Sequence, residues 1–375
     1  MFKTNYFAVQ SSVILFILFS AFLNDAGAKS IILKNSSKPT IGIDANVQYG
    51  FILIHRSTIQ HFSQTHFPLF QLAIYKRVTG TKSWHNLYYK PCVGFNLLYT
   101  NFSGNTLLKS AFGGQAFIDF CKRSYNKNSF HFRLAGGLGY VQQPFNRENN
   151  FKNIAIGSHL NGLIQLGYYF DKNISRKIGA SVGASITHLS NGAIKVPNLG
   201  LNILTAGIIF HCSNKNFDDI KTIKLIDTIP QKKHFEITIG AGIKQNYPVS
   251  SISYVAVSTR FQYYFYIKQK YNVSAGTDLF YDNGIRAKLK LDNAYNDANK
   301  TAVQVGVNMQ YQQNIGRFSI PLFFGAYAFS NYKDNGLFYS GLGIKHKITE
   351  HISAAIILKT HFARADYFMW SICYQ

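Results

Sequence analysis

The chain has 375 residues, of which 39 are Lys or Arg and 16 are Asp or Glu, so its formal net charge is +23. Hydrophobic residues make up 47% of the sequence and aromatic residues 15%, which excludes an intrinsically disordered chain. Four cysteines are too few for a disulfide-stapled scaffold, and no collagen or coiled-coil repeat runs through the sequence. The length fits two soluble domains or one large β-barrel.

Residues 1–28 have the features of a secretory signal peptide. Lys3 gives a positive start, residues 13–23 are apolar, and the small residues ending at Ala28 form a cleavage site. The apolar stretch is shorter than the ~20 residues that span a membrane as a helix. We therefore predict cleavage after Ala28 and export of the remaining chain, the alternative being an uncleaved membrane anchor.

Period-two alternation of polar and apolar residues predicts β-strands throughout the exported chain. The strands predicted in the first half cover residues 41–55, 69–77, 92–101, 107–121, 129–141, 154–170, 177–190 and 199–212. Those predicted in the second half cover residues 235–244, 251–267, 271–281, 301–312, 317–330, 337–347, 352–361 and 367–374. The predicted fold class is all-β, an antiparallel transmembrane β-barrel of about 14–16 strands. Its expected parts are barrel strands in 29–212, a polar linker or turn in 213–233, and further barrel strands in 234–375.

Loop lengths favour this barrel over a pair of soluble β-sandwiches divided near residue 225. Two long connections, 142–153 and 282–300, fall on the side assigned as outer, and several short polar turns fall on the other. The long connections 78–91 and 213–233 are exceptions, because both are assigned as inner. Few charges lie within the strands, as expected of a wall that faces lipid. Whether one barrel includes all the strands, or a smaller barrel carries an additional half, stays open.

The excess of positive charge favours an anionic partner. The signal peptide argues against nucleic acid, whereas basic loops fit phosphate-bearing lipid of an outer leaflet; a general role in solubility is the alternative. Cys92 and Cys121 lie on neighbouring predicted strands, so they either form a disulfide in an oxidising compartment or stay unpaired. No cofactor or metal is expected, because cysteine spacings typical of metal sites are absent. A group of three histidines lies at the first predicted outer loop, namely His55, His61 and His66. A metal site there is disfavoured because no carboxylate accompanies them.

Residues 178–190 contain the segment with recognisable chemistry. Small and mostly polar residues alternate there with apolar ones, and the apolar series continues into His188 and Ser190. Strand periodicity therefore places both side chains on the lipid-facing side, at the outer end of a strand. Residues at i and i+2 are roughly 6–7 Å apart at Cα, given a rise of ~3.3 Å per residue. The imidazole could activate the hydroxyl as a nucleophile, or the two could be an interfacial pair without chemistry.

A longer string of residues carries a family resemblance. His188-Leu189-Ser190-Asn191-Gly192, followed by Pro197-Asn198-Leu199-Gly200, resembles the catalytic string of the PagL-type outer-membrane lipid A 3-O-deacylases, also called acyloxyacyl hydrolases. The resemblance covers mainly residues 154–212, and residues 84–101 and 361–374 look more loosely like larger relatives. It implies that Ser190 is the nucleophile, that His188 is the general base, and that Asn191 and Asn198 form or support the oxyanion site. The implied substrate is an ester-linked 3-hydroxyacyl chain of lipid A in the bacterial outer membrane.

The third catalytic position departs from the family. The resemblance places a glutamate fourteen residues after the histidine, and that position here is Asn202. An amide oxygen can orient a neutral imidazole but cannot stabilise an imidazolium as a carboxylate does. The sequence thus leaves two hypotheses: a lipid A deacylase in which Asn202 orients His188, and a non-enzymatic pore or structural barrel with a degraded motif. Residues that could otherwise contribute are His159, His361, Glu148 and Asp366.

Overall fold

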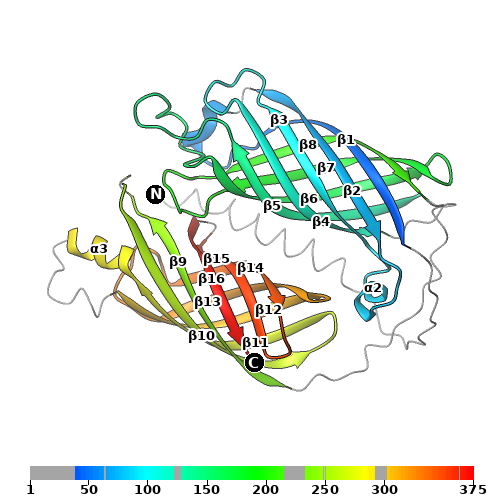
Figure 1. Ribbon diagram of the computed structural model, residues 1–375. Coiled ribbons are helices and arrows are strands. Elements are labelled where there is room, and N and C mark those ends of the chain that lie inside the picture. The colour runs from blue at the N-terminus through cyan, green and yellow to red at the C-terminus, as the bar shows by residue number, and fades with distance from the viewer. Residues whose placement is uncertain are drawn as a thin grey trace. The chain divides into compact units, whose positions relative to one another are not determined.

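The chain folds into two closed antiparallel β-barrels of eight strands each (Figure 1). The computed structural model describes residues 39–62, 65–121, 128–214, 233–247, 249, 251–291, 302–362 and 364–375. Within them the prediction of about 14–16 antiparallel strands is confirmed, because sixteen are found. The question of one barrel or two is answered by β1 closing on β8 and β9 closing on β16. The predicted signal peptide and residues 215–232 of the predicted linker lie outside the described residues.

The first barrel pairs each strand with its neighbour in the chain. Its strands are β1 (Thr40–Ile52), β2 (His66–Arg77), β3 (Cys92–Asn101), β4 (Ser110–Cys121), β5 (Ser129–Val141), β6 (Leu160–Asn173), β7 (Ile178–Ser190) and β8 (Leu201–Ser213). The 3-10 helix η1 (Ser57–Phe62) follows β1, and the short helix α2 (Ser83–Leu87) follows β2 at the opposite rim. The rim with η1 also carries the loops 102–109, 142–159 and 191–200.

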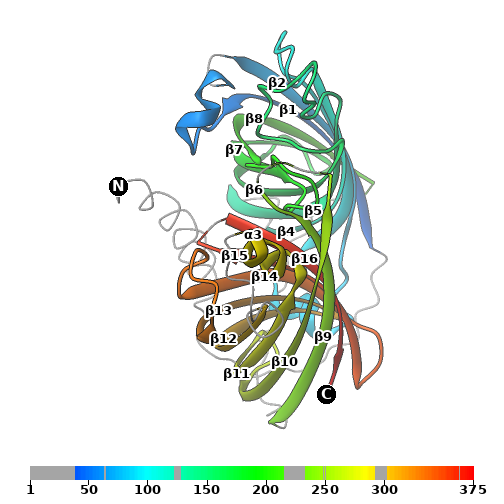
Figure 2. The same cartoon turned by 90° about the vertical axis from the view of Figure 1, so that its left-hand side faces the viewer.

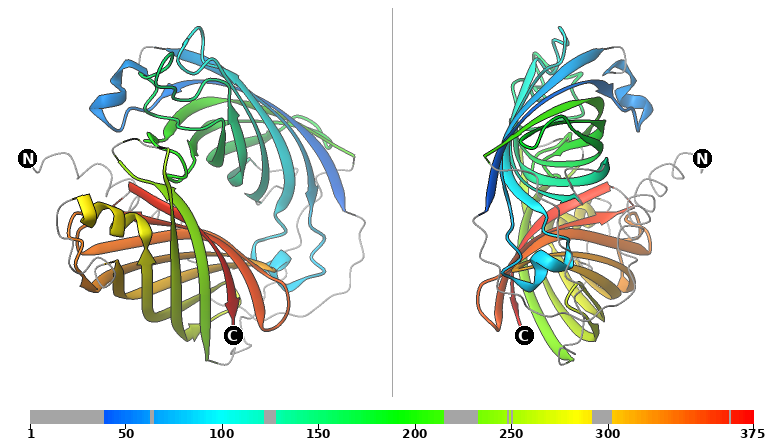
Figure 3. Two further views of the ribbon diagram at one scale, coloured as in Figure 1. Left: turned by 60° about the vertical axis from the view of Figure 1, so that its left-hand side comes forward. Right: turned by 90° about the vertical axis from the view of Figure 1, so that its right-hand side faces the viewer.

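The second barrel repeats the pattern in the C-terminal half. Its strands are β9 (His234–Gln245), β10 (Ser253–Ile267), β11 (Tyr271–Asp282), β12 (Val303–Ile315), β13 (Phe318–Ser330), β14 (Phe338–Lys347), β15 (Ile352–His361) and β16 (Arg364–Tyr374). Helix α3 (Asn283–Leu291) lies at one rim of this barrel, as Figure 2 and Figure 3 show. Its first turn is capped by Asp282, whose Oδ1 accepts a hydrogen bond from the Gly284 N–H at 2.7 Å. Among the described helices, none combines the length and the apolar character needed to cross a membrane.

The strands of both barrels turn polar side chains inward and apolar side chains outward. On β1, Asp44 is 1% exposed whereas the adjacent Ile43 is 57% exposed. On β10, Arg260 is buried and the adjacent Phe261 is exposed. This reversal of the pattern of soluble proteins is typical of barrels whose outer wall faces lipid.

Ion pairs fill the middle of the first barrel. The Arg133 guanidinium donates to Asp44 at 2.7 Å and to the two oxygens of Asp119 at 2.7 and 2.8 Å. His211 Nδ1 lies 2.7 Å from the other oxygen of Asp44. Buried charges require such partners, and an eight-stranded barrel is just wide enough for its own side chains. The interior is therefore occupied by a polar network that links strands across the barrel.

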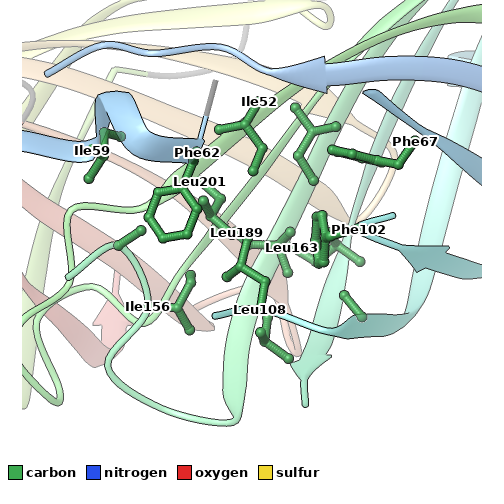
Figure 4. Packing of buried hydrophobic residues seen from close by; sticks show 14 residues of the cluster. Ile52, Ile59, Phe62, Phe67, Phe102, Leu108, Ile156, Leu163, Leu189 and Leu201 are labelled. Atoms are coloured by element: carbon green, nitrogen blue, oxygen red, sulfur yellow. The ribbon is translucent and has the colours of Figure 1, made fainter. Parts of the chain in front are cut away.

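An apolar cluster fills the rim of the first barrel that carries the long loops (Figure 4). Its buried members come from strands and loops alike: Ile52, Ile59, Phe62, Phe67, Phe102, Leu108, Ala111, Val141, Ala155, Ile156, Leu163, Leu189, Leu201 and Ile203. Leu189 points into this cluster, so its neighbours on β7, His188 and Ser190, point to the outside. The cluster thereby fixes the strand end that presents these two residues.

Candidate active site

His188 and Ser190 lie on the outer face of β7, on the same side of the strand. Both side chains are half-buried, whereas Thr187 and Leu189 are buried inside the barrel. Val182, earlier on the outer face, is 51% exposed. The strand thus places the imidazole and the hydroxyl where the alternation predicted, next to the loop 191–200.

Asn202 lies directly opposite His188 on the neighbouring strand β8. Its Oδ1 is 2.7 Å from His188 Nδ1. An amide oxygen can only accept a hydrogen bond, so the proton of the neutral imidazole is on Nδ1. Nε2 then carries a lone pair, as a base acting on a serine hydroxyl requires.

Asn198 contacts Ser190 directly, and the Asn191 side chain contacts the loop 142–159. Asn198 Nδ2 donates to Ser190 Oγ at 2.8 Å, and the Asn191 backbone N–H donates to Asn198 Oδ1 at 3.4 Å. This second contact orients the Asn198 amide with its N–H groups toward the hydroxyl. The Asn191 side chain is buried and donates instead to Ser158 Oγ at 2.8 Å. Asn191 therefore ties the loop 191–200 to the loop 142–159, and Asn198 is the amide beside the hydroxyl.

At Gly200 the backbone of the loop 191–200 lies close to the imidazole of His188. Its φ is +79°, and a Cβ added there would be 2.7 Å from His188 Cε1. Its N–H donates to the carbonyl of Ala155 at 2.9 Å. A side chain at this position would both strain the backbone and displace the ring, so glycine allows the loop to close over His188.

The site also includes His55, which the sequence did not assign to it. It follows β1, which closes the barrel against β8. Asn202 Nδ2 lies 3.1 Å from His55 Nδ1, and His55 Nε2 lies 3.1 Å from the carbonyl oxygen of Leu199. Burial lowers the pKa of His55 more than the hydrogen bond to Leu199 raises it. From the sequence, His55 was placed only at the end of the predicted strand 41–55, near His61 and His66. Its link to Asn202 was not visible there because the two residues are 147 positions apart.

The other candidates from the sequence lie elsewhere. His159 Nδ1 is 3.0 Å from the Val141 carbonyl, and its ring stacks on Tyr140. Glu148 is exposed in the loop 142–159. His361 and Asp366 belong to the second barrel, where Lys244 Nζ is 2.6 Å from Asp366 Oδ1 and His361 Nε2 is 2.8 Å from the hydroxyl of Tyr327. Lys244 and Tyr327 are both side chains of the second barrel itself.

Among the described residues, no group of three or more His, Cys, Asp and Glu side chains is arranged to hold a metal ion. The backbone register puts Asp119 opposite Cys92. The Cys121 side chain lies outside the described residues, so the two alternatives for Cys92 and Cys121, a disulfide or unpaired thiols, both stay open.

Family comparisons agree with the motif and extend it. Residues 70–219 match the family described as lipid A 3-O-deacylase (PagL), and residues 233–375 match the acyloxyacyl hydrolase C-terminal domain. The chain carries domains of the PagL lipid A 3-O-deacylase / acyloxyacyl hydrolase family. The second match covers every strand of the second barrel, so this PagL-family protein resembles its relatives well beyond residues 154–212. A search of the curated proteins finds no match.

Solved structures similar to this PagL-family protein include porins. A mutant of the Rh. blastica porin has 7% identity and a TM-score of 0.17, covering 90% of this chain and 99% of that chain. A triple mutant of the Rhodopseudomonas blastica porin has 8% identity and a TM-score of 0.17 over the same shares of the two chains. Similarity at this level is too low to support a conclusion, so the evidence for the fold is the strand pairing itself.

Proposed function

We propose that this PagL-family protein is an outer-membrane hydrolase that removes an ester-linked 3-hydroxyacyl chain from lipid A. The observation that carries the proposal is the 2.7 Å hydrogen bond from His188 Nδ1 to Asn202 Oδ1. It leaves Nε2 as a base on the face of β7 that also presents Ser190. Residues 70–219 match a family described as lipid A 3-O-deacylase, and this match supports lipid A as the proposed substrate.

The proposed reaction is acyl transfer to Ser190 followed by hydrolysis. Ser190 Oγ attacks the ester carbonyl while His188 Nε2 takes the hydroxyl proton. The tetrahedral intermediate collapses as the imidazolium returns this proton to the leaving sugar oxygen, and the acyl chain stays on Ser190. Water, deprotonated by the same imidazole, then releases the 3-hydroxy fatty acid and restores the serine.

Asn198 is the proposed side-chain donor to the oxyanion. Its Nδ2 lies 2.8 Å from Ser190 Oγ, next to where the carbonyl oxygen must lie during attack. The backbone N–H of Asn191 holds the amide in this orientation, so the donor is oriented before the substrate arrives. One such donor is worth ~3–4 kcal/mol in the transition state.

The surroundings fit a substrate that approaches through lipid. Exposed apolar side chains lie near His188 on the outer wall of the barrel. They include Ile164, opposite His188 on β6, and Leu204 on β8. The long loops at this rim carry exposed basic residues, including Arg56, Lys109 and Lys152. An acyl chain would lie along the apolar wall while the basic loops attract the phosphates of the headgroup.

The alternative, a pore or structural barrel, is less well supported. The Arg133 network fills the first barrel, and Arg260 Nε lies 2.6 Å from Asp278 Oδ1 inside the second. A conducting barrel needs a water-filled path through its interior. Side chains that pair across the interior favour the hydrolase.

The test is lipid A mass after incubation with the purified, refolded protein. We expect the wild type to remove one 3-hydroxyacyl chain and to release an equal amount of the free acid, and Ser190→Ala to remove none. Ser185→Ala is the matched control, because Ser185 lies on the same strand but faces the interior. Unchanged lipid A with the wild type, or deacylation by Ser190→Ala, would overturn the proposal.

A further inference from the structure

A single chain of hydrogen bonds leads from a backbone carbonyl to the proposed base. The Leu199 carbonyl oxygen is 3.1 Å from His55 Nε2, and His55 Nδ1 is 3.1 Å from Asn202 Nδ2. Asn202 Oδ1 is in turn 2.7 Å from His188 Nδ1. The backbone carbonyl of Leu53 is a further hydrogen-bond partner of His55. Along the three contacts just given, the direction of one hydrogen bond fixes the direction of the next.

The carbonyl at the start sets that direction. A carbonyl only accepts, so His55 Nε2 must carry the proton, and the Nδ1 of a neutral ring must then accept. Asn202 can satisfy an acceptor only with its amide N–H, which turns Oδ1 toward His188. The proton of His188 is thereby placed on Nδ1, away from Ser190.

An amide at position 202 needs a neighbour such as His55 to fix which of its ends faces His188, whereas a carboxylate does not. The two oxygens of a carboxylate are equivalent, so it accepts from His188 Nδ1 in either orientation. An amide turned by 180° would donate to Nδ1, and the proton of the imidazole would move to Nε2. His188 could not then accept the proton of Ser190.

We propose that His55 is a positioning residue that holds the Asn202 amide in the orientation required for His188 to act as a base. The catalytic consequence rests on the proposed function, but the placement of the proton on His188 does not. The two parts are therefore tested separately.

The first test observes the proton directly by NMR of protein labelled with ¹⁵N in its histidines, at neutral pH. The shifts of the two ring nitrogens distinguish N–H from bare nitrogen, and His188→Gln identifies the resonances of His188. We expect Nδ1–H and bare Nε2 in the wild type, and a shift of the proton toward Nε2 in His55→Phe. His61→Phe, in the adjacent helix η1, should leave the His188 pattern unchanged. An unchanged pattern in His55→Phe overturns the proposal, whether or not the protein hydrolyses lipid A.

The second test compares His55→Phe in two backgrounds. With Asn202 present we expect kcat to fall about two- to tenfold, because the amide then populates both orientations and only one leaves the base free. In the Asn202→Asp background we expect no loss. An equal loss in both backgrounds would make His55 a structural residue and would overturn the proposal. Absence of activity in every variant, the wild type included, would instead refute the proposed function, and the NMR test would still decide the role of His55.

Discussion

Replacing Asn202 with aspartate is expected to speed the proposed hydrolysis. Aspartate has the length of asparagine, so one of its oxygens can occupy the position of Oδ1, 2.7 Å from His188 Nδ1. When Nε2 takes the proton of Ser190, the imidazole becomes an imidazolium. It would then face a carboxylate in place of a neutral amide.

The size of the gain follows from the change in this one hydrogen bond. A neutral hydrogen bond contributes ~0.5–1.5 kcal/mol and one to a charged group ~1.5–3 kcal/mol, so the difference is about 1–2 kcal/mol. The difference applies mainly to the transition state, where the imidazole acquires its charge. At 1.36 kcal/mol per tenfold, kcat should rise about 5- to 30-fold.

His55 should reduce this gain. The second oxygen of the aspartate would face His55 Nδ1, which lies 3.1 Å from the amide nitrogen that it replaces. A carboxylate there favours a protonated His55, and the resulting positive charge offsets part of the new negative one. The full gain is therefore expected in the double variant His55→Phe/Asn202→Asp.

The assay is single-turnover release of 3-hydroxy fatty acid from lipid A in mixed micelles, with each variant first shown to be folded by its heat-dependent migration on a gel. Asn202→Leu is the opposite perturbation, and it should lower the rate at least about tenfold because the tautomer of His188 is no longer fixed. If the folded double variant His55→Phe/Asn202→Asp hydrolyses lipid A no faster than the wild type, the predicted gain is wrong. Such a result would mean that charge does not develop on the ring that Asn202 contacts.

Three further results are expected. Gly200→Ala should abolish most of the activity, because the new Cβ would lie 2.7 Å from His188 Cε1. Gly104→Ala is the matched control, because Gly104 has a similar φ of +78° and no atom within 4 Å of an added Cβ. Equal activity of the two variants would contradict the role of this contact. Asn198→Ala should lower kcat about 10²- to 10³-fold with little change in KM, as measured by steady-state kinetics, because it removes the oxyanion donor; a change confined to KM would point to substrate binding instead. Burial, reinforced by Lys82 and Lys76, lowers the pKa of His85 to about 4, so the neutral ring stabilises the segment around α2 fully above pH 6.5 and progressively less as the pH falls toward 4. Hydrogen exchange of residues 83–87, corrected for its intrinsic pH dependence, should therefore accelerate over that range in the wild type and not in His85→Gln.

Strand positions were predictable because each strand separates two different environments. The predicted ranges 92–101 and 129–141 coincide with β3 and β5, where buried polar residues such as Asn96 and Arg133 alternate with more exposed apolar neighbours. The predicted strand 154–170 began too early, since β6 starts at Leu160. Ala155 and Ile156 are apolar because they pack into the cluster at the rim of the barrel, held there by Asn153, whose amide donates to the carbonyls of Leu107 and Gln143. A loop that packs into the end of a barrel is as apolar as a strand, so the sequence alone does not distinguish the two.

The number of barrels was not predictable, because closure leaves no local signature. A strand shows the same alternation of interior and exterior residues whether it pairs with the next strand in the chain or closes the barrel on a strand seven positions earlier. β1 pairs with β8 across Gly42 and Ser213, and β16 pairs with β9 across Ser371 and Gly240. The residues on either side of these seams look like those of any other strand.

The same reasoning explains which part of the site the sequence revealed. His188, Ser190 and Asn202 lie on adjacent strands in a continuous stretch of chain, so alternation and a family motif suffice to align them. His55 reaches Asn202 only through the closing seam between β1 and β8. Ser158 reaches Asn191 through a loop contact, which no period in the sequence encodes.

The amide at position 202 and the second imidazole are two parts of one physical solution. A carboxylate on the outer face of a wall that faces lipid would carry a large desolvation penalty unless it were paired. The chain of Leu199, His55, Asn202 and His188 carries no formal charge at rest, so it avoids that penalty. The neutral amide, however, has two unequal ends, and a group outside the proposed pair of His188 and Ser190 must decide which end faces the base. Charge would then appear only during attack, as an imidazolium beside an oxyanion, where each offsets the other.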